Sequence, residues 1–588
     1  MMKKALLCIP ALVLLLPAAL AQEKTISVAD QKGFDRIQAD IVAAATQGVK
    51  DIKVDLKEGE YVFRENHIVL SNRAWPELSI SLEGNGSIIR PEGNDYRNGG
   101  SYAGGFDRRH SFMTPEGEDV ELFEHFKYSD SKVSLVRKLP EGSLCRIAVS
   151  GYGNIDEKRC ANTFIQISQT WQSNFFPVKE IRDGYAYFIV KDLTVNESKK
   201  DYYINDDVTC FGERIRYKLC NAAGVSDSFR ILDGRVRLPA SVASVREGKA
   251  NCFLLVSGCK LKAFSMKGFK FHGNADKEAF LVRIVKSDLQ AADISACEFR
   301  GIQSRAVGIF GNTGVTVRGN IFLDCYRECV VANENSVDAS ITDNRFCRVG
   351  KRWQNTQAIQ AFGKNYLIAR NVIEDFGTYG IGVGEWQGAA GEDSSYGVTE
   401  YNELFFSEGY QKDCLNRTLM DSGAIYVWTK NKHAVIRYNR IHDFTGPMDN
   451  RGIFCDNGAR NFSIYGNIIT GIANSYCIDS WRYAGNEKDI GPTNVNNEIR
   501  DNVVDGPIRF MARAKDSGCK LGRTYVYGNA AVAGLGNVIS ELPSHGAFVQ
   551  LSGTETPDGG LVLDRASYRR LRRGNPEFGR IKDRIKRK

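Results

Sequence analysis

The stretch "GIFCDNGARNFSIYGNIIT" (residues 452–470) contains two short apolar runs joined by a polar segment. Asp456 ends the first run, and Asn467 interrupts the second. Alternating, β-branched residues flanked by Gly, Asn or Asp are typical of strands that end in tight turns. Whether Asp456 only ends a strand or works as a carboxylate depends on what the rest of the chain repeats.

Ten segments share the form of "IYGNII", and their fourth positions lie 23 to 37 residues apart. They are MKGFKF (266–271), ISACEF (294–299), VRGNIF (317–322), ITDNRF (341–346), IARNVI (368–373), TEYNEL (399–404), IRYNRI (436–441), IYGNII (464–469), IRDNVV (499–504) and VYGNAA (526–531). The fourth position is Phe269, then Cys297, then asparagine in the other eight. This period favours an all-β chain with one three-strand coil of a parallel β-solenoid per repeat. Stacked coils would place the asparagines in a side-chain amide ladder with a structural role.

A second strand precedes most of these units, and its aligned positions alternate in character. The strands are AVGIFG (306–311), CVVANE (329–334), AIQAFG (358–363), GIGVGE (380–385), AIYVWT (424–429), GIFCDN (452–457) and CIDSWR (477–482). Positions two and four are small or apolar throughout, so we expect them to point into the solenoid.

Positions three and five should then face outward, and they combine aromatic rings with acids. The candidate sugar-stacking residues on and beside this face are Tyr426, Trp428, Phe454, Trp481 and Trp386. Large exposed rings beside carboxylates indicate a ligand-binding groove. The alternative is packing beneath an inserted segment.

The other parts of the chain are predicted from composition and pattern. Residues 1–21 form a signal peptide, with two lysines ahead of an apolar run, which predicts a secreted or periplasmic protein. Residues 22–94 form an N-terminal cap and the first coils, with an amphipathic helix at 34–45 plugging the open end. Residues 95–255 are an inserted β-rich module, 256–540 the β-helix core, and 541–588 a C-terminal segment with a basic tail. No later stretch approaches the roughly 18 apolar residues of a membrane span.

Charge gives no guide to the partner. The formal net charge is +8, but the last twenty residues hold ten Lys or Arg against two acids. Without this tail and the leader, the body carries about −2. The basic tail is interpreted as a solvated terminal segment, with binding to an anionic surface as the alternative.

The fifteen cysteines show no Cys-x-x-Cys pair, so no metal site is predicted. Cys297, Cys455 and Cys477 lie inside apolar runs and are predicted to be small buried hydrophobes. Two pairs are close enough in sequence for disulfides after export, Cys210 with Cys220 and Cys252 with Cys259.

The pieces "DSGAIYVW" (421–428), "HAVIRYNRIHDF" (433–444) and "GIFCDNGARNFSIYGNIIT" resemble secreted bacterial β-helix carbohydrate-active enzymes of the pectate-lyase-like superfamily. The similarity is to the β-helix glycoside hydrolases of the fucosidase and xylan-active type, and "QTWQSNFFPVKEI" (169–181) and "ILDGRVRLPAS" (231–241) match more loosely. The resemblance implies a right-handed β-helix acting on glycans, with Asp421 and Asp456 as the catalytic pair. Asn457 departs from the pattern, because relatives often have a second Asp there.

Glycoside hydrolysis needs one carboxylic acid and one carboxylate, about 5 Å apart for retention or about 6.5 to 9.5 Å apart for inversion. The strand alignment stacks Asp421 on Asp449 at about 5 Å. It sets Asp456 and Asp479 one coil and two residues apart, on the order of 8 Å. With Glu385 as a further acid, several pairs satisfy the requirement, and the sequence does not choose among them.

A polysaccharide lyase acting on a uronic-acid polymer is the main alternative. Arg451, Arg460 and Arg482 could hold a substrate carboxylate or sulfate. A base for β-elimination would come from Lys430, His433, Tyr426 or Arg451, with calcium or an arginine stabilising the intermediate. A non-catalytic glycan-binding solenoid is the third possibility. In each case we expect a monomer with a polysaccharide or oligosaccharide partner, no nucleic acid, no membrane insertion and, for the hydrolase, no cofactor.

Overall fold

The computed structural model describes most of the solenoid and part of the inserted module. The described residues are 23–63, 66–91, 95–96, 111–113, 127–129, 133–140, 142–158, 160, 163–168, 173–190, 193–196, 201–204, 215–221, 230–232, 235–237, 242–244, 252–273, 280–302, 305–325, 327–333, 335–350, 356–384, 395–409, 422–428, 433–444, 450–456, 459–472, 476–480, 497–510, 524–532, 539–540, 549–555 and 561–588. The predicted signal peptide lies outside them.

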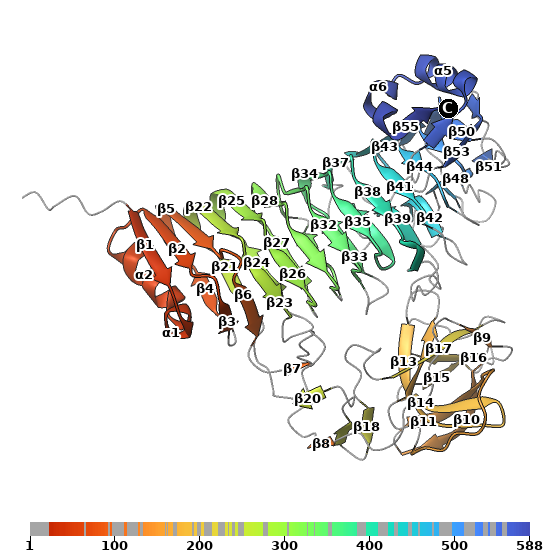
Figure 1. The fold of residues 1–588 in the computed structure, drawn as a ribbon, viewed down its shortest axis with the longest axis horizontal. Helices are drawn as coiled ribbons and strands as arrows, with labels where there is room; N and C mark the ends of the chain where they lie inside the picture. Colours follow the sequence, from red (N-terminus) through yellow and green to blue (C-terminus); the bar gives the residue numbers. More distant parts are fainter. Residues whose placement is uncertain are drawn as a thin grey trace, which may run out of the picture.

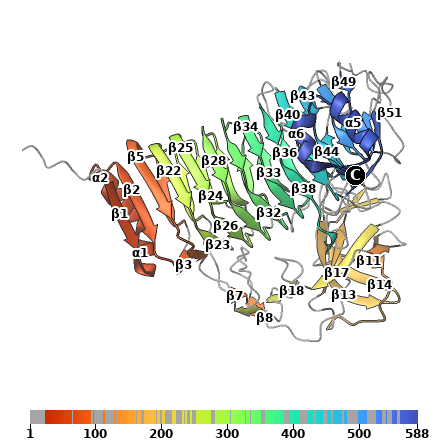
Figure 2. The same ribbon diagram turned by 45° about the horizontal axis from the view of Figure 1, so that its top comes forward.

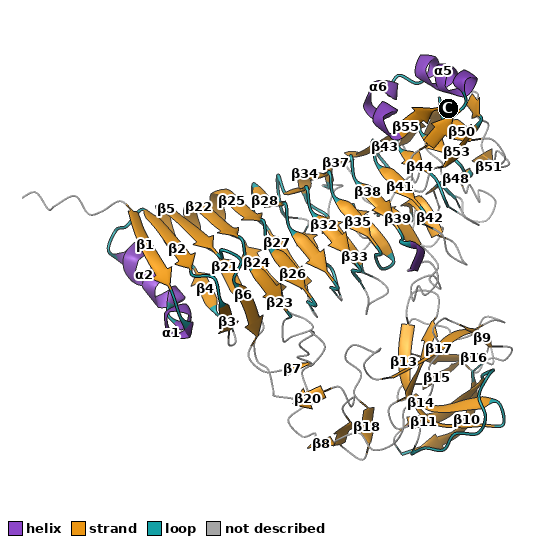
Figure 3. Ribbon diagram, viewed as in Figure 1, coloured by secondary structure: helices purple, strands orange, loops and turns teal. Residues whose placement is uncertain are grey.

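Three long parallel sheets wind into a β-helix, as the sequence predicted (Figure 1). Each coil contributes one strand to each sheet, and the coils stack side by side along the axis. We name the sheets A, B and C. In the part of the chain that the structure describes, Figure 3 shows little helix, most of it near the two ends of the stack.

Sheet A has thirteen strands: β1 (Glu23–Val28), β2 (Asp51–Leu56), β5 (Ala74–Glu83), β22 (Lys260–Lys267), β25 (Asp288–Ser295), β28 (Val315–Arg318), β31 (Ser340–Thr342), β34 (Lys364–Ala369), β37 (Tyr396–Glu400), β40 (His433–Arg437), β43 (Phe462–Tyr465), β46 (Asn497–Arg500) and β49 (Thr524–Tyr527). Sheet B also has thirteen: β3 (Glu60–Phe63), β6 (Ile88–Pro91), β23 (Lys270–His272), β26 (Glu298–Arg300), β29 (Ile321–Leu323), β32 (Arg345–Cys347), β35 (Val372–Glu374), β38 (Glu403–Phe405), β41 (Arg440–His442), β44 (Ile468–Ile469), β47 (Val503–Val504), β50 (Ala530–Val532) and β52 (Val549–Leu551).

Sheet C has twelve strands: β4 (Ile68–Ser71), β21 (Leu254–Ser257), β24 (Phe280–Val285), β27 (Arg305–Phe310), β30 (Val330–Ala332), β33 (Gln357–Ala361), β36 (Tyr379–Val383), β39 (Ser422–Val427), β42 (Asn450–Cys455), β45 (Ile478–Ser480), β48 (Ile508–Phe510) and β51 (Ile539–Ser540). The strands aligned from the sequence are those of sheet C, and their register is the predicted one. Position two of the alignment, from Val307 to Ile478, is fully buried in the solenoid core.

The turn from sheet A to sheet B is the most regular part of the coil. From β22 to β49 it has two residues, the first with φ between 50° and 72° and the second at the fourth position of the repeat. Glycine adopts this conformation freely, yet Arg370, Tyr401 and Tyr438 also occupy it. The asparagine that follows supplies the compensating hydrogen bonds.

The asparagines form the predicted amide ladder. Asn371 donates from Nδ2 to Oδ1 of Asn402 over 2.9 Å, and its backbone N–H donates to the same oxygen over 3.0 Å. Its Nδ2 also donates to the carbonyl of Ile341. The arrangement repeats from Asn320 to Asn529, with every amide buried. Each rung therefore fixes the register of the next coil.

The connections at the two ends of the sheet C strands vary in length. From β22 onward the turn from sheet A to sheet B never changes, whereas the connections into and out of sheet C include residues 384–395, 406–421 and 481–496. The inserted module also enters here, because it follows β6 of sheet B and precedes β21 of sheet C. Variable connections grouped on a rigid scaffold commonly carry function.

The N-terminal end is covered by two helices, α1 (Gln31–Asp35) and α2 (Ile37–Thr46), where the sequence predicted one. The break falls at Arg36, which ends α1 and precedes α2. Phe34, Ile37 and Ile41 are buried as predicted.

The inserted module contains an antiparallel sheet of seven strands. They are β9 (Lys127–Ser129), β10 (Ser134–Leu139), β11 (Gly142–Ala148), β12 (Thr163–Ser168), β13 (Ser173–Arg182), β14 (Tyr185–Val190) and β17 (Ile215–Asn221). Short strands accompany it: β7 (Asp95–Tyr96), β8 (Ser111–Met113), β15 (Leu193–Asn196), β16 (Asp201–Ile204), β18 (Arg230–Leu232), β19 (Arg235–Arg237) and β20 (Val242–Ser244). The sheet has its own apolar core, separate from that of the solenoid. In both views it lies outside the stack of coils (Figures 1 and 2).

The basic tail is folded, so its interpretation as a solvated segment is wrong. It forms α5 (Arg565–Gly574), α6 (Phe578–Ile581), η3 (Lys582–Arg584) and β55 (Ile585–Arg587), preceded by β53 (Gly553–Glu555) and β54 (Leu561–Leu563). Leu571, Phe578 and Ile581 are buried against the last coils.

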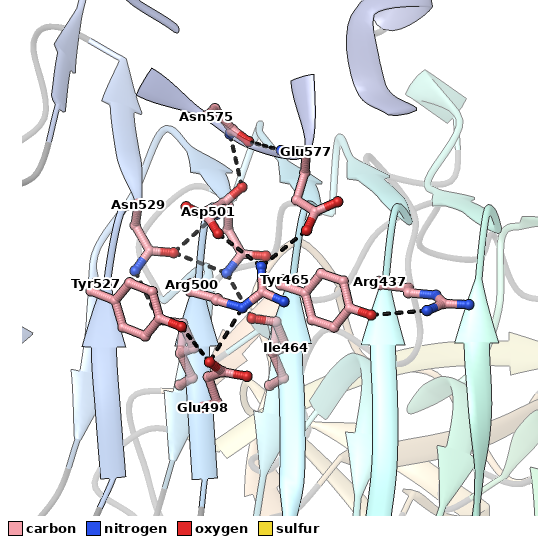
Figure 4. Close-up of polar contacts among 12 residues, drawn as sticks. Arg437, Ile464, Tyr465, Glu498, Arg500, Asp501, Tyr527, Asn529, Asn575 and Glu577 are labelled. Carbon is pink, nitrogen blue, oxygen red and sulfur yellow. Dashed lines mark hydrogen bonds and ion pairs between the residues drawn. The ribbon is translucent and has the colours of Figure 1, made fainter. Parts of the chain in front are cut away.

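Polar contacts add to this docking, as Figure 4 shows. Arg500 of β46 donates to Glu577 over 3.0 Å and lies over the ring of Tyr465. Asn575 donates to the backbone carbonyl of Asp501. The sequence interpretation relied on the many cationic side chains of the tail and did not take its buried apolar residues into account.

The cysteine predictions divide. Cys297, Cys455 and Cys477 are buried, as expected. The Cys252/Cys259 disulfide is wrong, because the two residues flank opposite ends of β21. Four strand residues span about 13 Å, beyond the roughly 7 Å that a disulfide bridges between Cα atoms. Cys210 lies outside the described residues.

Candidate functional site

Two columns of side chains run along the outer face of sheet C, across its C-terminal coils. One column is Tyr379, Gly423 and Arg451, on β36, β39 and β42. The other is Gly382, Tyr426, Phe454, Asp479 and Arg509, on β36, β39, β42, β45 and β48. Residues between these positions, such as Ile425 and Ile453, belong to the solenoid core.

The aromatic residues of this face form a cluster of their own, separate from the solenoid core. It contains Tyr379, Tyr426, Trp428 and Phe454, with Phe362 against it. Tyr426 lies 4.3 Å from Tyr379 and 4.6 Å from Trp428 between ring centroids. Their exposed fractions are 0 to 6%, so these four rings do not form the open stacking groove that the sequence suggested. They act as a packed layer that supports polar groups beside them.

Gly382 makes room for this layer. A Cβ atom at this position would lie 2.3 Å from Cζ3 of Trp428. The missing side chain on β36 therefore leaves room for the Trp428 ring.

Of the two predicted carboxylates that the structure describes, Asp456 and Asp479, Asp456 is the one that is partly accessible. It follows β42, and its half-buried side chain accepts a short hydrogen bond from the hydroxyl of Tyr426. Its backbone N–H donates to the carbonyl of Val427 over 3.1 Å. Both the backbone and the side chain are thus held by β39, one coil earlier. A hydrogen bond donated to a carboxylate favours its ionised form.

Asp479 has a different environment, since its side chain is fully buried between two arginines. Oδ2 accepts from Nε of Arg451 over 2.5 Å, while Arg509 donates to both oxygens over 2.8 and 2.6 Å. Arg451 is fully buried, and the side chain of Arg509 is 17% exposed. Each guanidinium also lies over a ring, Arg451 over Phe454 at 4.0 Å and Arg509 over Tyr476 at 3.8 Å.

Sequence reasoning missed Arg509. Strand β48 was not among the aligned strands, because it is short and follows Pro507 without the flanking pattern of the others. The signal available was register: the coil after Asp479 places Arg509 in the same column. Extending the alignment by one coil would have paired the two residues.

Two of the other predicted site residues are described by the structure, and the remaining ones lie outside the described residues. His433 begins β40 of sheet A and is exposed, so it does not join the face of sheet C. Arg460 lies between β42 and β43 and is half-buried. Outside the described residues lie Asp421, Asp449, Glu385, Trp386, Lys430, Trp481 and Arg482.

Among the described residues, no group of three or more His, Cys, Asp or Glu could hold a metal ion. Within the same part of the chain, no helix is long and apolar enough to span a bilayer.

No protein-family model matches the chain, and no curated protein matches it in sequence. Solved structures do. One described as "Glycoside hydrolase" is 12% identical, with 87% of this chain and 96% of that chain covered and a TM-score of 0.40. The complex of XylC with xylose is 11% identical, with 91% and 88% covered and a TM-score of 0.42. The Pseudomonas phage phi297 tailspike gp61 is 9% identical, with 86% and 73% covered and a TM-score of 0.23. At this similarity the function has to be inferred from the residues of this chain.

Proposed function

We propose that the outer face of sheet C binds a glycan and cleaves its glycosidic bonds by hydrolysis. The observation that carries the proposal is the hydrogen bond from Tyr426 to Asp456. It holds a half-buried, partly accessible carboxylate beside a rigid aromatic layer, on the sheet whose edges carry the variable connections.

The geometry suits Asp456 to one of the two carboxylate roles. A hydrogen bond donated by a phenol favours the ionised form of a carboxylate, which a nucleophile or a water-activating base requires. The general acid would then be a second carboxyl group. Asp421, Asp449 and Glu385 remain the candidates for it.

The same contacts disfavour elimination. A lyase needs a cation free to meet the substrate carboxylate, but Arg451 and Arg509 both donate charge-assisted hydrogen bonds to Asp479. His433, a candidate base, lies on sheet A instead. The hydroxyl of Tyr426 already donates a hydrogen bond to Asp456. Hydrolysis therefore ranks ahead of β-elimination, and a non-catalytic glycan-binding solenoid ranks third.

We also propose that the protein is exported after cleavage near Ala21 and acts as a monomer without a cofactor. The leader sequence motivates the first part. Mass analysis of the protein recovered from culture tests the cleavage. Size-exclusion chromatography tests the monomeric state, and the mass of the native protein after this step tests whether a cofactor is bound.

The test is a panel of plant and host polysaccharides incubated with the protein, with the products weighed. Hydrolysis adds one water across each cleaved bond, whereas elimination leaves an unsaturated sugar without it. Asp456→Asn should lower activity by about 10²- to 10⁴-fold, with unchanged circular dichroism. The matched control is Asp338→Asn, which removes a turn carboxylate bonded to Asn365.

Each outcome of the panel decides something. Full activity in both Asp456→Asn and Asp421→Asn would refute the catalytic assignment. Unsaturated products would establish the lyase. A protein that retains glycans but yields neither kind of product would be a binding solenoid.

A further inference from the structure

Asp479 was a candidate catalytic carboxylate, and its contacts argue against that role. Both of its oxygens accept charge-assisted hydrogen bonds from arginines, and its side chain has no exposed surface. A general acid must hand a proton to the substrate, but both oxygens of this buried carboxylate face the two guanidinium groups instead. A nucleophile must touch the substrate, which full burial prevents. What Asp479 does contact leads toward Asp456.

The contacts form a continuous series across three coils. Asp479 holds Arg451, whose guanidinium lies 4.0 Å from the centroid of Phe454. The Phe454 ring meets the Tyr426 ring edge-on, with centroids 5.2 Å apart and planes at 90°. The hydroxyl of Tyr426 then donates a hydrogen bond to Asp456. Every member of the series except Asp456 is at most 2% exposed, so the rings have little room to move.

We propose that Asp479 is a positioning residue for Asp456. It anchors Arg451 over Phe454, and Phe454 in turn fixes the Tyr426 ring at the place where its hydroxyl reaches the Asp456 carboxylate. The inference rests on the proposed function only in taking Asp456 as the reactive carboxylate.

The reactivity of Asp456 can be measured without a substrate. Trypsin cleaves after Arg451 and Arg460, and the resulting peptide, residues 452–460, contains Asp456 as its single carboxyl side chain. A water-soluble carbodiimide with glycinamide labels protonated, accessible carboxyl groups. Mass analysis of this peptide after brief labelling of the folded protein, at mildly acidic pH, therefore reports the state of Asp456. The tryptic peptide of residues 54–57 contains Asp55 as its single carboxyl side chain, and this residue forms an ion pair with Lys53 in β2. Labelling of this peptide is the internal reference.

Three variants test the series. Tyr426→Phe removes the donor and should raise labelling of Asp456 about five-fold, the effect of losing one ordinary hydrogen bond. Asp479→Asn and Phe454→Leu should raise it in the same direction, with Asp55 unchanged. Phe454→Leu matters most, because it keeps the buried ion cluster intact even if Asp479→Asn fails to fold.

A double variant separates positioning from simple loosening. If Phe454 acts through Tyr426, then adding Phe454→Leu to Tyr426→Phe should change nothing further. The matched control is Phe310→Leu, because Phe310 lies on sheet C under Arg283 and edge-on to Phe280 in the same arrangement, five coils earlier. It should leave Asp456 labelling at the wild-type rate.

Wild-type labelling of Asp456 in Phe454→Leu would overturn the inference. So would equal effects of Phe454→Leu with and without the Tyr426 hydroxyl. Neither result bears on whether glycans are cleaved. Conversely, this labelling pattern in a protein that cleaves no glycan would support the positioning role of Asp479 and refute the proposed function.

Discussion

The hydroxyl of Tyr438 donates a 2.7 Å hydrogen bond to Glu577, 139 residues further along the chain. Tyr438 occupies the left-handed position of an A-to-B turn, and Glu577 precedes α6. Burial and the neighbouring carboxylate raise the pKa of Tyr438, so its proton stays in place. The bond ties the C-terminal helices to the side of the solenoid.

Glu577→Gln should therefore loosen the C-terminal segment. Tyr438 and Arg500 both donate to this carboxylate, and hydrogen bonds to a charged group contribute about 1.5–3 kcal/mol. Hydrogen exchange should quicken in residues 561–588 and stay slow in β33 to β42. Asp583→Asn, an exposed carboxylate in the same segment, is the control. Uniformly faster exchange through both regions would contradict the local role.

Replacing an asparagine in the middle of the amide ladder should lower the free energy of unfolding more than replacing one at its end. Asn402 accepts two hydrogen bonds from Asn371 and donates to Ile368 and Asn439. Asn402→Leu leaves these buried groups without partners and should lower the free energy of unfolding by about 2–4 kcal/mol. Asn529→Leu, at the described end of the ladder, should cost less in the same denaturant titration. Equal losses would mean that the rungs do not cooperate.

His442 predicts a window of pH in which the solenoid is most stable. Burial alone would lower its pKa, but hydrogen bonds to Asp443 and Glu403 outweigh burial and raise it above 6.5. The hydrogen bond to His442 lowers the pKa of Glu403 below 4.5. Because the pKa of His442 is raised on folding, the histidine adds stability that is lost as pH rises through its folded pKa. Because the pKa of Glu403 is lowered on folding, the glutamate adds stability that is lost as pH falls through its folded pKa.

Unfolding free energies of the wild type and His442→Gln should thus differ most between about pH 4.5 and 6.5. The gap should narrow on both the alkaline and the acid side. Measurement by denaturant titration across pH 4 to 9 checks the sign. A gap that widens above pH 8 would show that the histidine is neutral in the folded protein.

Gly382→Ala should displace the Trp428 ring, since the added Cβ would lie 2.3 Å from it. Trp428 is one of six tryptophans, so the displacement should change part of the intrinsic fluorescence. If the aromatic layer supports the site, cleavage of whichever glycan the panel identifies should fall with it. Gly409→Ala, with nothing within 4 Å of the added atom, should change neither.

Strand period and the recurring asparagines were enough to predict the β-helix, because one face of each strand is buried and a one-residue slip would reverse it. They also placed Asp456 and Phe454 on the outer face. Exposure could not be read in this way. Alternation says that Tyr426 points out of the solenoid, but not that the ring is 2% exposed. The paired arginines of Asp479 depend on contacts between coils 28 and 30 residues apart.

The folded tail had a signal that charge concealed. Leu571, Phe578, Ile581 and Ile585 recur at intervals of 7, 3 and 4 residues, a regular apolar pattern whose members the structure divides among α5, α6 and β55. Ten cations among the last twenty residues directed attention to the solvated side instead.

The constant two-residue turn has a consequence for how this molecule can change. Because sheets A and B are locked in register by the asparagines, insertions at the edges of sheet C leave the pitch of the coil untouched. New loops could be grafted there, or the seven-stranded module exchanged, without retuning the scaffold. Specificity and stability are thereby free to be engineered, or to diverge, as separate properties of one chain.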